Sequence, residues 1–506
     1  MNYKNLLLAF ICLGFFSCSK FDLDYFKNHQ KDTKEDPSSF SEVASIDIGD
    51  AGAAEISAYD PKTKRLFVVN NSTTNKIDVV RFENLSALSV VASIDVMPYG
   101  GFVNSVAVHD GLLAAAIEST NKQAPGKVVI FKTSDYSVVK IIAVGSLPDM
   151  ITFSPDGHYI VTANEGEPSS DYLNDPLGTV SVISAKQNFS VVNIDFSSFA
   201  NAQASLQSKG LRVFGPNASL AQDIEPEYVA ISDDSRTAWV TLQENNAIAK
   251  IDLISKSVTQ IFPLGFKNYH AESNAIDPSD RDNKIEFNTW PVKGMYQPDA
   301  IAVLLNKGTP YLFTANEGDV REYNAFNEAK RVGSLTLDPA AFPNAATLIL
   351  PEQLGRLNVT TTIGDEGKDN DFENLFSFGA RSFSVWNGNT GSLVFDSKNE
   401  LEKKAKEAQF YDDTRSDDKG VEPEGLALGF VGKSNLAFIG LERADAVAIY
   451  DVTNPSYPSF LQILKSGDGP EGILFIPAKD SPNQQSLLVV SSENDGVIKI
   501  YMPKKL

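Results

Sequence analysis

DMITFSPDGHYIVTAN, residues 149–164, opens the stretch that decides the fold, and two more apolar segments follow it, TVSVIS at 179–184 and SVVNIDF at 190–196. The tight turn Pro155-Asp156-Gly157 separates the first two apolar segments, and its glycine supplies a positive φ. Val, Ile and aromatic residues dominate the segments, as is typical of buried strands. The stretch therefore predicts four short strands joined by turns.

The same pattern recurs seven times along the chain. Each copy opens with a carboxylate or an amide at the start of its first strand, at Glu55, Asn104, Asp149, Glu227, Asp299, Glu424 and Glu471. Each second strand closes with Asn or Glu, at Asn70-Asn71, Glu118, Asn164-Glu165, Glu244-Asn245, Asn316-Glu317, Glu442 and Glu493-Asn494. Repeats of roughly 40 to 45 residues with several short strands are typical of β-propellers. The sequence predicts an all-β fold, a seven-bladed β-propeller of the YVTN or WD40 type spanning residues 42–506.

The last copy lacks a fourth strand. Val43–Gly49 (VASIDIG) nearly duplicates Val91–Met97 (VASIDVM), which is the expected fourth strand of the first copy. We therefore expect the N-terminal strand to complete the last blade, because an open sheet edge would invite aggregation.

The first 17 residues have the features of a secretory signal, with Lys4 ahead of an apolar run and Ser17 before Cys18. This setting resembles the lipidated cysteine of bacterial lipoproteins, and the alternative is a plain signal peptide that is cut elsewhere. Residues 18–41 are polar and charged, which predicts a flexible tether. We expect a lipoprotein of the cell envelope that is attached to the outer membrane through Cys18.

The direction of the strands predicts which end of the sheets carries the functional face. The start of a first strand and the end of a second strand lie at the same end of an antiparallel sheet. The long insertions at 197–225, 266–297, 318–381 and 397–423 open at that end too, whereas the turns at the other end are short. One elaborated face on a rigid scaffold is where binding is expected. Within the insertions, Glu400–Gln409 predicts a solvated helix and Ala202–Lys209 a weaker one.

Composition narrows the function. The formal net charge is −21, which argues against nucleic acid as a partner. Four histidines in the whole chain make a His-rich zinc site a poor expectation. Many acidic loops favour a hard ion with oxygen ligands, so calcium is the expected cofactor, without an organic one. We expect a monomer that binds the membrane through its lipid and an unidentified small molecule or surface ligand.

The candidate metal ligands are acids on the predicted face. Thr162–Glu167 and Thr314–Asp319 are near twins that place carboxylates around a glycine. The loop GDEGKDNDFE at 364–373 resembles part of a calcium loop. The resulting set is Glu165, Glu317, Asp319, Glu424, Asp365, Asp369, Asp371 and Glu373. The alternative is that these residues cap turns, which acidic groups do well.

Three arginines lie beside these acids in the sequence, namely Arg321, Arg381 and Arg415. An arginine next to a carboxylate-bound metal can hold a phosphate-like anion. A structural salt bridge explains each arginine as well.

Five strings give the chain a family resemblance: MYQPDAIAV (295–303), FTANEGDVREY (313–323), FENLFSFGARSFSVWN (372–387), DDTRSDDKGVEPEGLALG (412–429) and ERADAVAIYDVTNP (442–455). Together they resemble the choice-of-anchor I family, which groups secreted bacterial surface propellers with the animal mesenchyme-specific cell surface glycoproteins. The resemblance implies a surface propeller held by an anchor, here Cys18. Some members are labelled alkaline-phosphatase-like.

Two functions follow from these observations. The first is a lipid-anchored propeller that binds calcium and serves as a ligand-binding scaffold. The alternative is a calcium-dependent phosphoesterase, in which Glu165, Glu317, Asp319 and Glu424 hold metal. The three arginines would then bind phosphate while a metal-bound water attacks.

Overall fold

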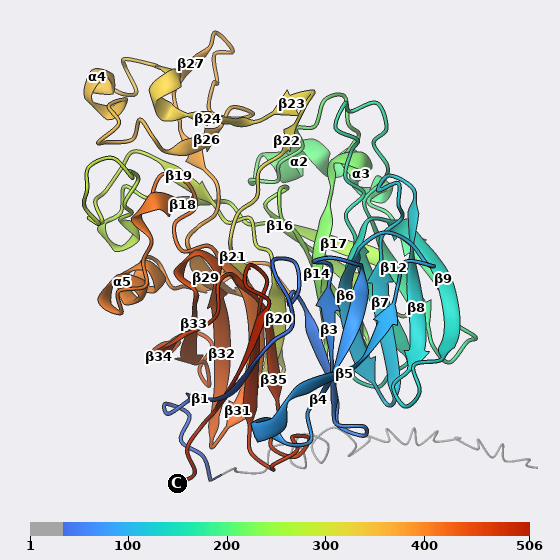
Figure 1. The fold of residues 1–506 in the computed structure, drawn as a ribbon. Coiled ribbons are helices and arrows are strands. Elements are labelled where there is room, and N and C mark those ends of the chain that lie inside the picture. The colour runs from blue at the N-terminus through green and yellow to red at the C-terminus, as the bar shows by residue number, and fades with distance from the viewer. Residues whose placement is uncertain (1–33) are drawn as a thin grey trace, which may run out of the picture.

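Seven sheets of four antiparallel strands form the frame of the described chain, residues 34–506, in this computed structural model (Figure 1). Sheet 1 consists of β2 (Ser57–Asp60), β3 (Arg65–Asn70), β4 (Lys76–Arg81) and β5 (Ser89–Asp95). Sheet 2 consists of β6 (Val103–His109), β7 (Leu112–Ile117), β8 (Pro125–Lys132) and β9 (Val138–Ser146). Sheet 3 consists of β10 (Pro148–Phe153), β11 (Tyr159–Asn164), β12 (Thr179–Ser184) and β13 (Ser190–Ile194).

The other four sheets have the same plan. Sheets 4 and 5 consist of β14 (Pro226–Ile231), β15 (Thr237–Leu242), β16 (Ala247–Asp252) and β17 (Ser257–Pro263), then β20 (Ile301–Asn306), β21 (Thr309–Asn316), β29 (Ser382–Asn387) and β30 (Leu393–Asp396). Sheets 6 and 7 consist of β31 (Pro423–Val431), β32 (Ser434–Leu441), β33 (Ala446–Asp451) and β34 (Ser459–Lys465), then β35 (Pro470–Ile476), β36 (Leu487–Ser492), β37 (Val497–Met502) and β1 (Ser41–Asp47).

The first strands of the sheets form a closed series. β2 contacts β6, β6 contacts β10 and β10 contacts β14, and the series continues through β20, β31 and β35 back to β2. A separate hydrophobic cluster fills each gap between neighbouring sheets. Four-stranded antiparallel sheets that follow one another around a central channel make a β-propeller.

The N-terminal strand closes the last sheet, as predicted. β1 pairs antiparallel with β37, from Ser41 opposite Met502 to Asp47 opposite Val497. Phe40 is 2% exposed and packs edge-on against Phe438 of sheet 6, with ring centroids 5.4 Å apart. The closure therefore joins the two ends of the described chain by a ladder and by buried aromatic surface.

The chain just before β1 is packed as well. The buried Glu35 carboxylate accepts hydrogen bonds from the backbone N–H and the hydroxyl of Ser486, at 2.9 and 2.8 Å. The Leu506 N–H donates to the Lys34 carbonyl at 2.9 Å. The predicted tether, residues 18–41, thus has an ordered last part. Its earlier part, the predicted signal and Cys18 lie outside the described residues.

The insertions build a second layer at one end of the sheets (Figure 1). It contains α2 (Gln203–Gln207), α3 (Leu220–Asp223), α4 (Ala345–Leu348) and α5 (Glu400–Glu407), and the strand pairs β22 (Glu322–Tyr323) with β23 (Phe326–Asn327) and β25 (Thr336–Leu337) with β27 (Asp371–Phe372). A five-stranded sheet joins β18 (Phe266–Asn268), β19 (Lys293–Met295), β28 (Phe376–Ser377), β26 (Asn358–Thr360) and β24 (Ala329–Arg331). Residues 269–375 also contribute a hydrophobic core of their own.

The two expected helices form within the predicted ranges, but one expectation about α5 is wrong. Leu401 and Ala405 of α5 are fully buried in the core between sheets 5 and 6, and Glu402 is buried beside Arg381. Residues spaced four apart share one face of a helix. The helix is therefore solvated on one side only. None of the described helices is long and apolar enough to cross a membrane.

We expect Phe40→Ala to lower the free energy of unfolding by about 3–5 kcal/mol, because the substitution empties a buried aromatic site at the closure. Val43→Ala on the same strand is the matched control, since Val43 is 39% exposed. That substitution should change stability by less than about 0.5 kcal/mol. Urea unfolding measures both, and equal midpoints for the two variants would contradict a closure that depends on Phe40.

Candidate functional site

The seven residues that open the first strands meet at the centre of the ring. One cavity of about 280 Å³ is lined by Asn104, Asp149, Glu227, Asp299, Glu424 and Glu471, and also by Glu317 and Asp319. An adjoining cavity of about 390 Å³ shares Asn104, Asp149 and Glu471 and adds Glu55, Glu118, Glu165, Glu167 and Glu493. The strand-start residues and most of the strand-end acids therefore line one acidic channel mouth on the side of the insertions.

Local backbone irregularities accompany these side chains. The pairing register shifts between Pro148 and Ile151, and the same shift follows the opening prolines of β14, β31 and β35. Such a bulge leaves residues outside the ladder and re-aims their side chains. Asp149, Glu227 and Glu424 each occupy the position after the proline, where the ladder is interrupted.

The residue before the opening proline carries backbone strain in three of the sheets. Leu147, Gln297 and Glu422 have φ values of 49°, 41° and 49°. A non-glycine residue in this left-handed region costs about 1 kcal/mol or more. The Gln297 side chain also donates to the Asp319 carbonyl at 2.7 Å and accepts from the Gly379 N–H at 3.2 Å. The strained residue thus also ties the loop that carries Asp319 to the channel mouth.

The channel carboxylates repel one another. Burial, and then the charge of Glu493, raises the pKa of Glu55 to about 8. Burial, and then Glu167, raises the pKa of Asp149 to about 7. Burial and neighbouring carboxylates also hold the pKa values of further acids well above their ordinary range, namely Glu165, Glu227, Asp299, Glu424 and Glu471. The mouth therefore attracts protons and cations.

Three of these acids form what we call the unpaired cluster: Asp149, Glu165 and Glu227. Carboxylate oxygens of the three lie within 4.8 Å of one another. The Glu227 Oε2 atom is buried without a hydrogen-bond partner. Lys122, a nearby cation, is half exposed and lies 3.9 Å from Glu118.

A second group, the lysine-bound cluster, consists of Glu317, Glu422 and Glu442, whose oxygens also lie within 4.8 Å of one another. Lys419 reaches into this group. Its ammonium contacts the Glu317 carboxylate and lies 3.1 Å from Glu422 Oε2. Arg443 pairs with Glu442 at 2.9 Å. Protein cations therefore balance this cluster.

The three predicted phosphate-binding arginines all contact protein acceptors. Arg321 is 3% exposed, pairs with Asp223 at 2.8 Å and Glu225 at 3.0 Å, and stacks on Phe214. Arg381 is 1% exposed and donates to Glu402 at 3.1 Å.

Three backbone carbonyls also accept from Arg381, those of Asp277, Ser416 and Asp418. Arg415 donates to Glu422 at 2.6 Å and to Asp418 at 3.2 Å, and its side chain stays 30% exposed. A phosphate-binding role for the three stays a prediction, and the salt-bridge alternative describes the contacts that they make here.

The predicted metal ligands fall into separate places. Glu165 belongs to the unpaired cluster and Glu317 to the lysine-bound cluster. Asp319 and Glu424 line the channel cavity, and Glu424 Oε2 is a buried atom without a hydrogen-bond partner.

The remaining predicted ligands lie in the second layer, in the loop that holds β27 (Figure 1). Oxygens of Asp369, Asp371 and Glu373 lie within 4.8 Å of one another there. Asp365 accepts the backbone N–H groups of Asp369 and Asn370 at 3.2 and 3.1 Å. Asp365 thus acts within this loop as a turn acceptor.

The predicted set of metal ligands does not include Lys419, Glu244, Asp149 or Glu227, although Asp149 and Glu227 are among the seven strand-start residues that the repeat marks. The Pro-Asp and Pro-Glu pairs that open the strands were a usable signal for Asp149 and Glu227. Lys419 lies in an acidic loop string without any pattern that marks it as a buried cation.

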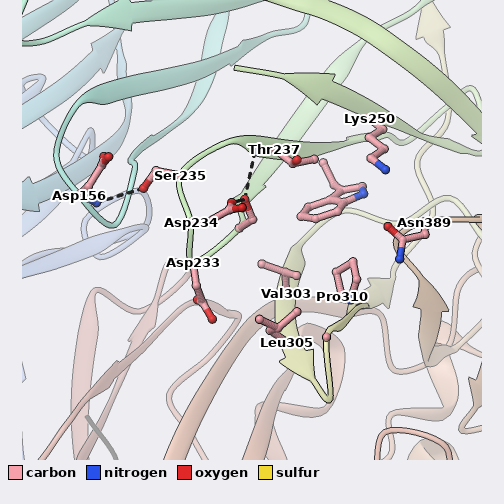
Figure 2. Close-up of a pocket in the computed structure, with 13 residues that line it drawn as sticks. Asp156, Asp233, Asp234, Ser235, Thr237, Lys250, Val303, Leu305, Pro310 and Asn389 are labelled. Atoms are coloured by element: carbon pink, nitrogen blue, oxygen red, sulfur yellow. Dashed lines mark hydrogen bonds between the residues drawn. The ribbon is translucent and has the colours of Figure 1, made fainter. Parts of the chain in front are cut away.

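A larger cavity of about 680 Å³ lies at the short-turn end, between sheets 4 and 5 (Figure 2). Trp239, Val303, Leu305 and Pro310 line its apolar part. Asp234, also in its wall, accepts a hydrogen bond from Ser232 at 2.6 Å within its own turn. Three aspartates, Asp156, Asp233 and Asp234, also line this cavity, far fewer acids than at the channel mouth.

We expect Arg321→Met to destabilise the protein by about 3–5 kcal/mol, because it leaves the buried Asp223 and Glu225 without a cation. Arg281→Met is the matched control, since the Arg281 side chain is 59% exposed. Thermal unfolding compares the two. Wild-type stability in Arg321→Met would show that this guanidinium is not structural and would favour its predicted role in anion binding.

Among solved structures, the chain is similar to a hydrazine synthase of Kuenenia stuttgartiensis, with a TM-score of 0.50 and 13% identity, covering 92% of this chain and 99% of that one. A looser likeness, at a TM-score of 0.47 and 8% identity, is to the β-propeller domain of Cps50 (Swd1) of Myceliophteria thermophila, covering 92% of this chain and 100% of that one. The hydrazine synthase likeness shows the fold alone.

Two curated proteins match at the sequence level. Gigasin-3a of Magallana gigas is 29% identical over 182 residues, covering 29% of this chain and 64% of that protein. A mesenchyme-specific cell surface glycoprotein of Strongylocentrotus purpuratus is 28% identical over 347 residues, covering 57% of this chain and 44% of that protein. The matched part is less than two thirds of either relative. The model of the choice-of-anchor I domain matches residues 55–455, and the chain therefore belongs to the choice-of-anchor I domain family.

Proposed function

We propose that this protein is a lipid-anchored β-propeller of the cell envelope, whose seven sheets are seven blades and whose channel mouth binds calcium as part of a ligand-binding surface. The observation that carries the proposal is the unpaired cluster, where three carboxylates converge and no lysine or arginine of residues 34–506 forms an ion pair with them. A hard divalent cation with oxygen ligands suits such a group.

The orientation of the chain supports a surface role. Lys34 and Leu506 lie together at the end of the sheets opposite the insertions (Figure 1). An anchor at Cys18 would therefore attach on that side and leave the acidic mouth turned away from the membrane. A family defined by an anchored domain, and a relative named as a cell surface glycoprotein, support a surface or secreted location.

A scaffold is favoured over a phosphoesterase by the contacts of the arginines. A phosphate site needs cationic donors that face the metal-bound ligand. Arg321 and Arg381 are buried and donate to acceptors of the protein itself. We therefore assign the acidic mouth to binding and not to phosphate hydrolysis.

The proposal predicts a calcium effect that depends on pH. Carboxyl groups whose folded-state pKa is raised stabilise the fold while they hold a proton, and this stability is lost as the pH rises through the folded-state pKa. For Asp149 and Glu55 the raised values are about 7 and about 8. The metal-free protein should therefore lose stability between about pH 4 and pH 8. Calcium should replace the protons at the upper end of this range.

Thermal unfolding in EDTA and in excess calcium, at pH 5 and at pH 8, measures this effect. We expect calcium to raise Tm by a few degrees at pH 8 and by much less at pH 5. Free calcium at about 100 times Kd stabilises a folded protein by about 2.7 kcal/mol. Identical Tm values in EDTA and calcium at pH 8 would contradict calcium binding.

The anchor is tested separately. We expect Cys18→Ser to move the protein from the membrane fraction to the soluble fraction of cells that process lipoproteins, because the cysteine that is predicted to carry the lipid is gone. Cys12→Ser is the matched control and should leave the protein with the membrane. Unchanged membrane association of Cys18→Ser would contradict the lipid anchor at Cys18, but it would not affect the proposal for the channel.

A further inference from the structure

The channel mouth holds two groups of three carboxylates, each with oxygens within 4.8 Å of one another, but the two groups have different surroundings. Glu317, Glu422 and Glu442 form the lysine-bound cluster, and Asp149, Glu165 and Glu227 form the unpaired cluster. Two oxygens on opposite sides of one calcium ion lie about 4.8 Å apart, twice the usual distance from calcium to oxygen. The oxygens of each group therefore lie close enough together to contact one calcium ion.

Lys419 takes the place of a cation in the first group. It is 9% exposed and contacts Glu317 and Glu422 together. Glu422 also accepts from Arg415 at 2.6 Å, and Gln243 donates to the second oxygen of Glu317 at 2.9 Å. This network leaves little negative charge for a metal ion.

The unpaired cluster has no such cation. Among the described residues, no lysine or arginine forms an ion pair with Asp149, Glu165 or Glu227. A fourth acid adds to the need for a cation, since Glu244 is 4% exposed and its Oε2 atom has no hydrogen-bond partner among the described residues. The charge of Glu244 acts on Glu165 and Glu227 and raises the pKa of both, after the larger effect of burial. A buried carboxylate oxygen without a partner is costly unless a cation or a proton meets it.

We propose that the two clusters are balanced by different cations: Lys419 is the built-in cation of the lysine-bound cluster, and one divalent cation, calcium, binds Asp149, Glu165 and Glu227. This rests on the proposed function and adds the position and the number of the ions. The proposal also distinguishes the channel site from the loop of Asp369, Asp371 and Glu373, where Asp369 is exposed and the other two acids are partly buried. Since Lys419 fills the lysine-bound cluster, its removal should open a second calcium site.

Calorimetric titration of the chelated full-length protein with calcium chloride at pH 8 tests the proposal. We expect one calcium ion per wild-type chain. Glu227→Gln should weaken its binding by more than about tenfold, since even partners of metal ligands are worth ten- to a hundredfold. Asp371→Asn, in the loop with Asp369 and Glu373, is the matched control and should bind calcium as the wild type does. Glu227→Gln should also melt higher than the wild type in EDTA, because the substitution removes a repelling charge.

The lysine is tested by a pair of variants. Lys419→Met should bind a second calcium ion, whereas Lys419→Arg keeps a cation in place and should bind one. If Lys419→Met is unfolded in EDTA, recovery of its fold in calcium supports the proposal, and failure to recover overturns the role of Lys419.

The outcomes separate this inference from the proposed function. Wild-type affinity in Glu227→Gln together with lost binding in Asp371→Asn would place calcium in the loop of Asp371. That result overturns the inference and leaves a calcium-binding protein. Absence of calcium binding by the wild-type chain would overturn the proposed function itself.

Discussion

Convergence of like charges at one point is the constraint on which this structure depends. The first strands of all the sheets begin at the same end of one ring, so a residue repeated at each strand start meets its own copies. Here six of those seven residues, Asn104 being the exception, are carboxylic acids. The repeat that makes the fold regular therefore makes its centre electrostatically unfavourable. Interrupted strand starts and strained residues such as Leu147 and Gln297 hold these acids in the channel despite that cost.

The insertions supply cations that balance some of these acids on one side of the ring. Lys419 and Arg415, which balance Glu317 and Glu422, come from the insertion between sheets 5 and 6. Arg321 comes from the insertion within sheet 5 and pairs with acids of the segment before sheet 4. Breaking a buried pair costs more than the pair contributes, because a charge is left alone in a medium of low polarity. The second layer thus forms the surface at this end of the ring and also supplies the cations that pair with buried acids.

The strands could be predicted because they are local. Alternating apolar residues, Gly turns and a repeat of fixed length place Tyr159–Asn164 and Thr179–Ser184 where the structure has them. The closure by β1 followed from a duplicated string. The arrangement of the cations could not be predicted, because it depends on contacts between distant residues. Asp223 and Arg321 are 98 positions apart, and Lys419 and Glu317 are 102 apart. The same holds for α5, whose polar composition hides the two residues that bury it.

The two clusters at the channel mouth differ in how the charge of their carboxylates is balanced. Where a lysine is built in, it stays charged at any ordinary pH, since burial alone would lower the Lys419 pKa but Glu317, Glu422 and Asp319 hold it well above its usual value. Where no cation is built in, burial and neighbouring carboxylates hold the pKa values of the acids above their ordinary range, with that of Asp149 raised to about 7. The lysine-bound cluster therefore carries its own cations, whereas the unpaired cluster is the part of the mouth that we propose to bind a metal ion. In the proposed calcium-binding propeller, the unpaired cluster is the part of the mouth that responds to calcium.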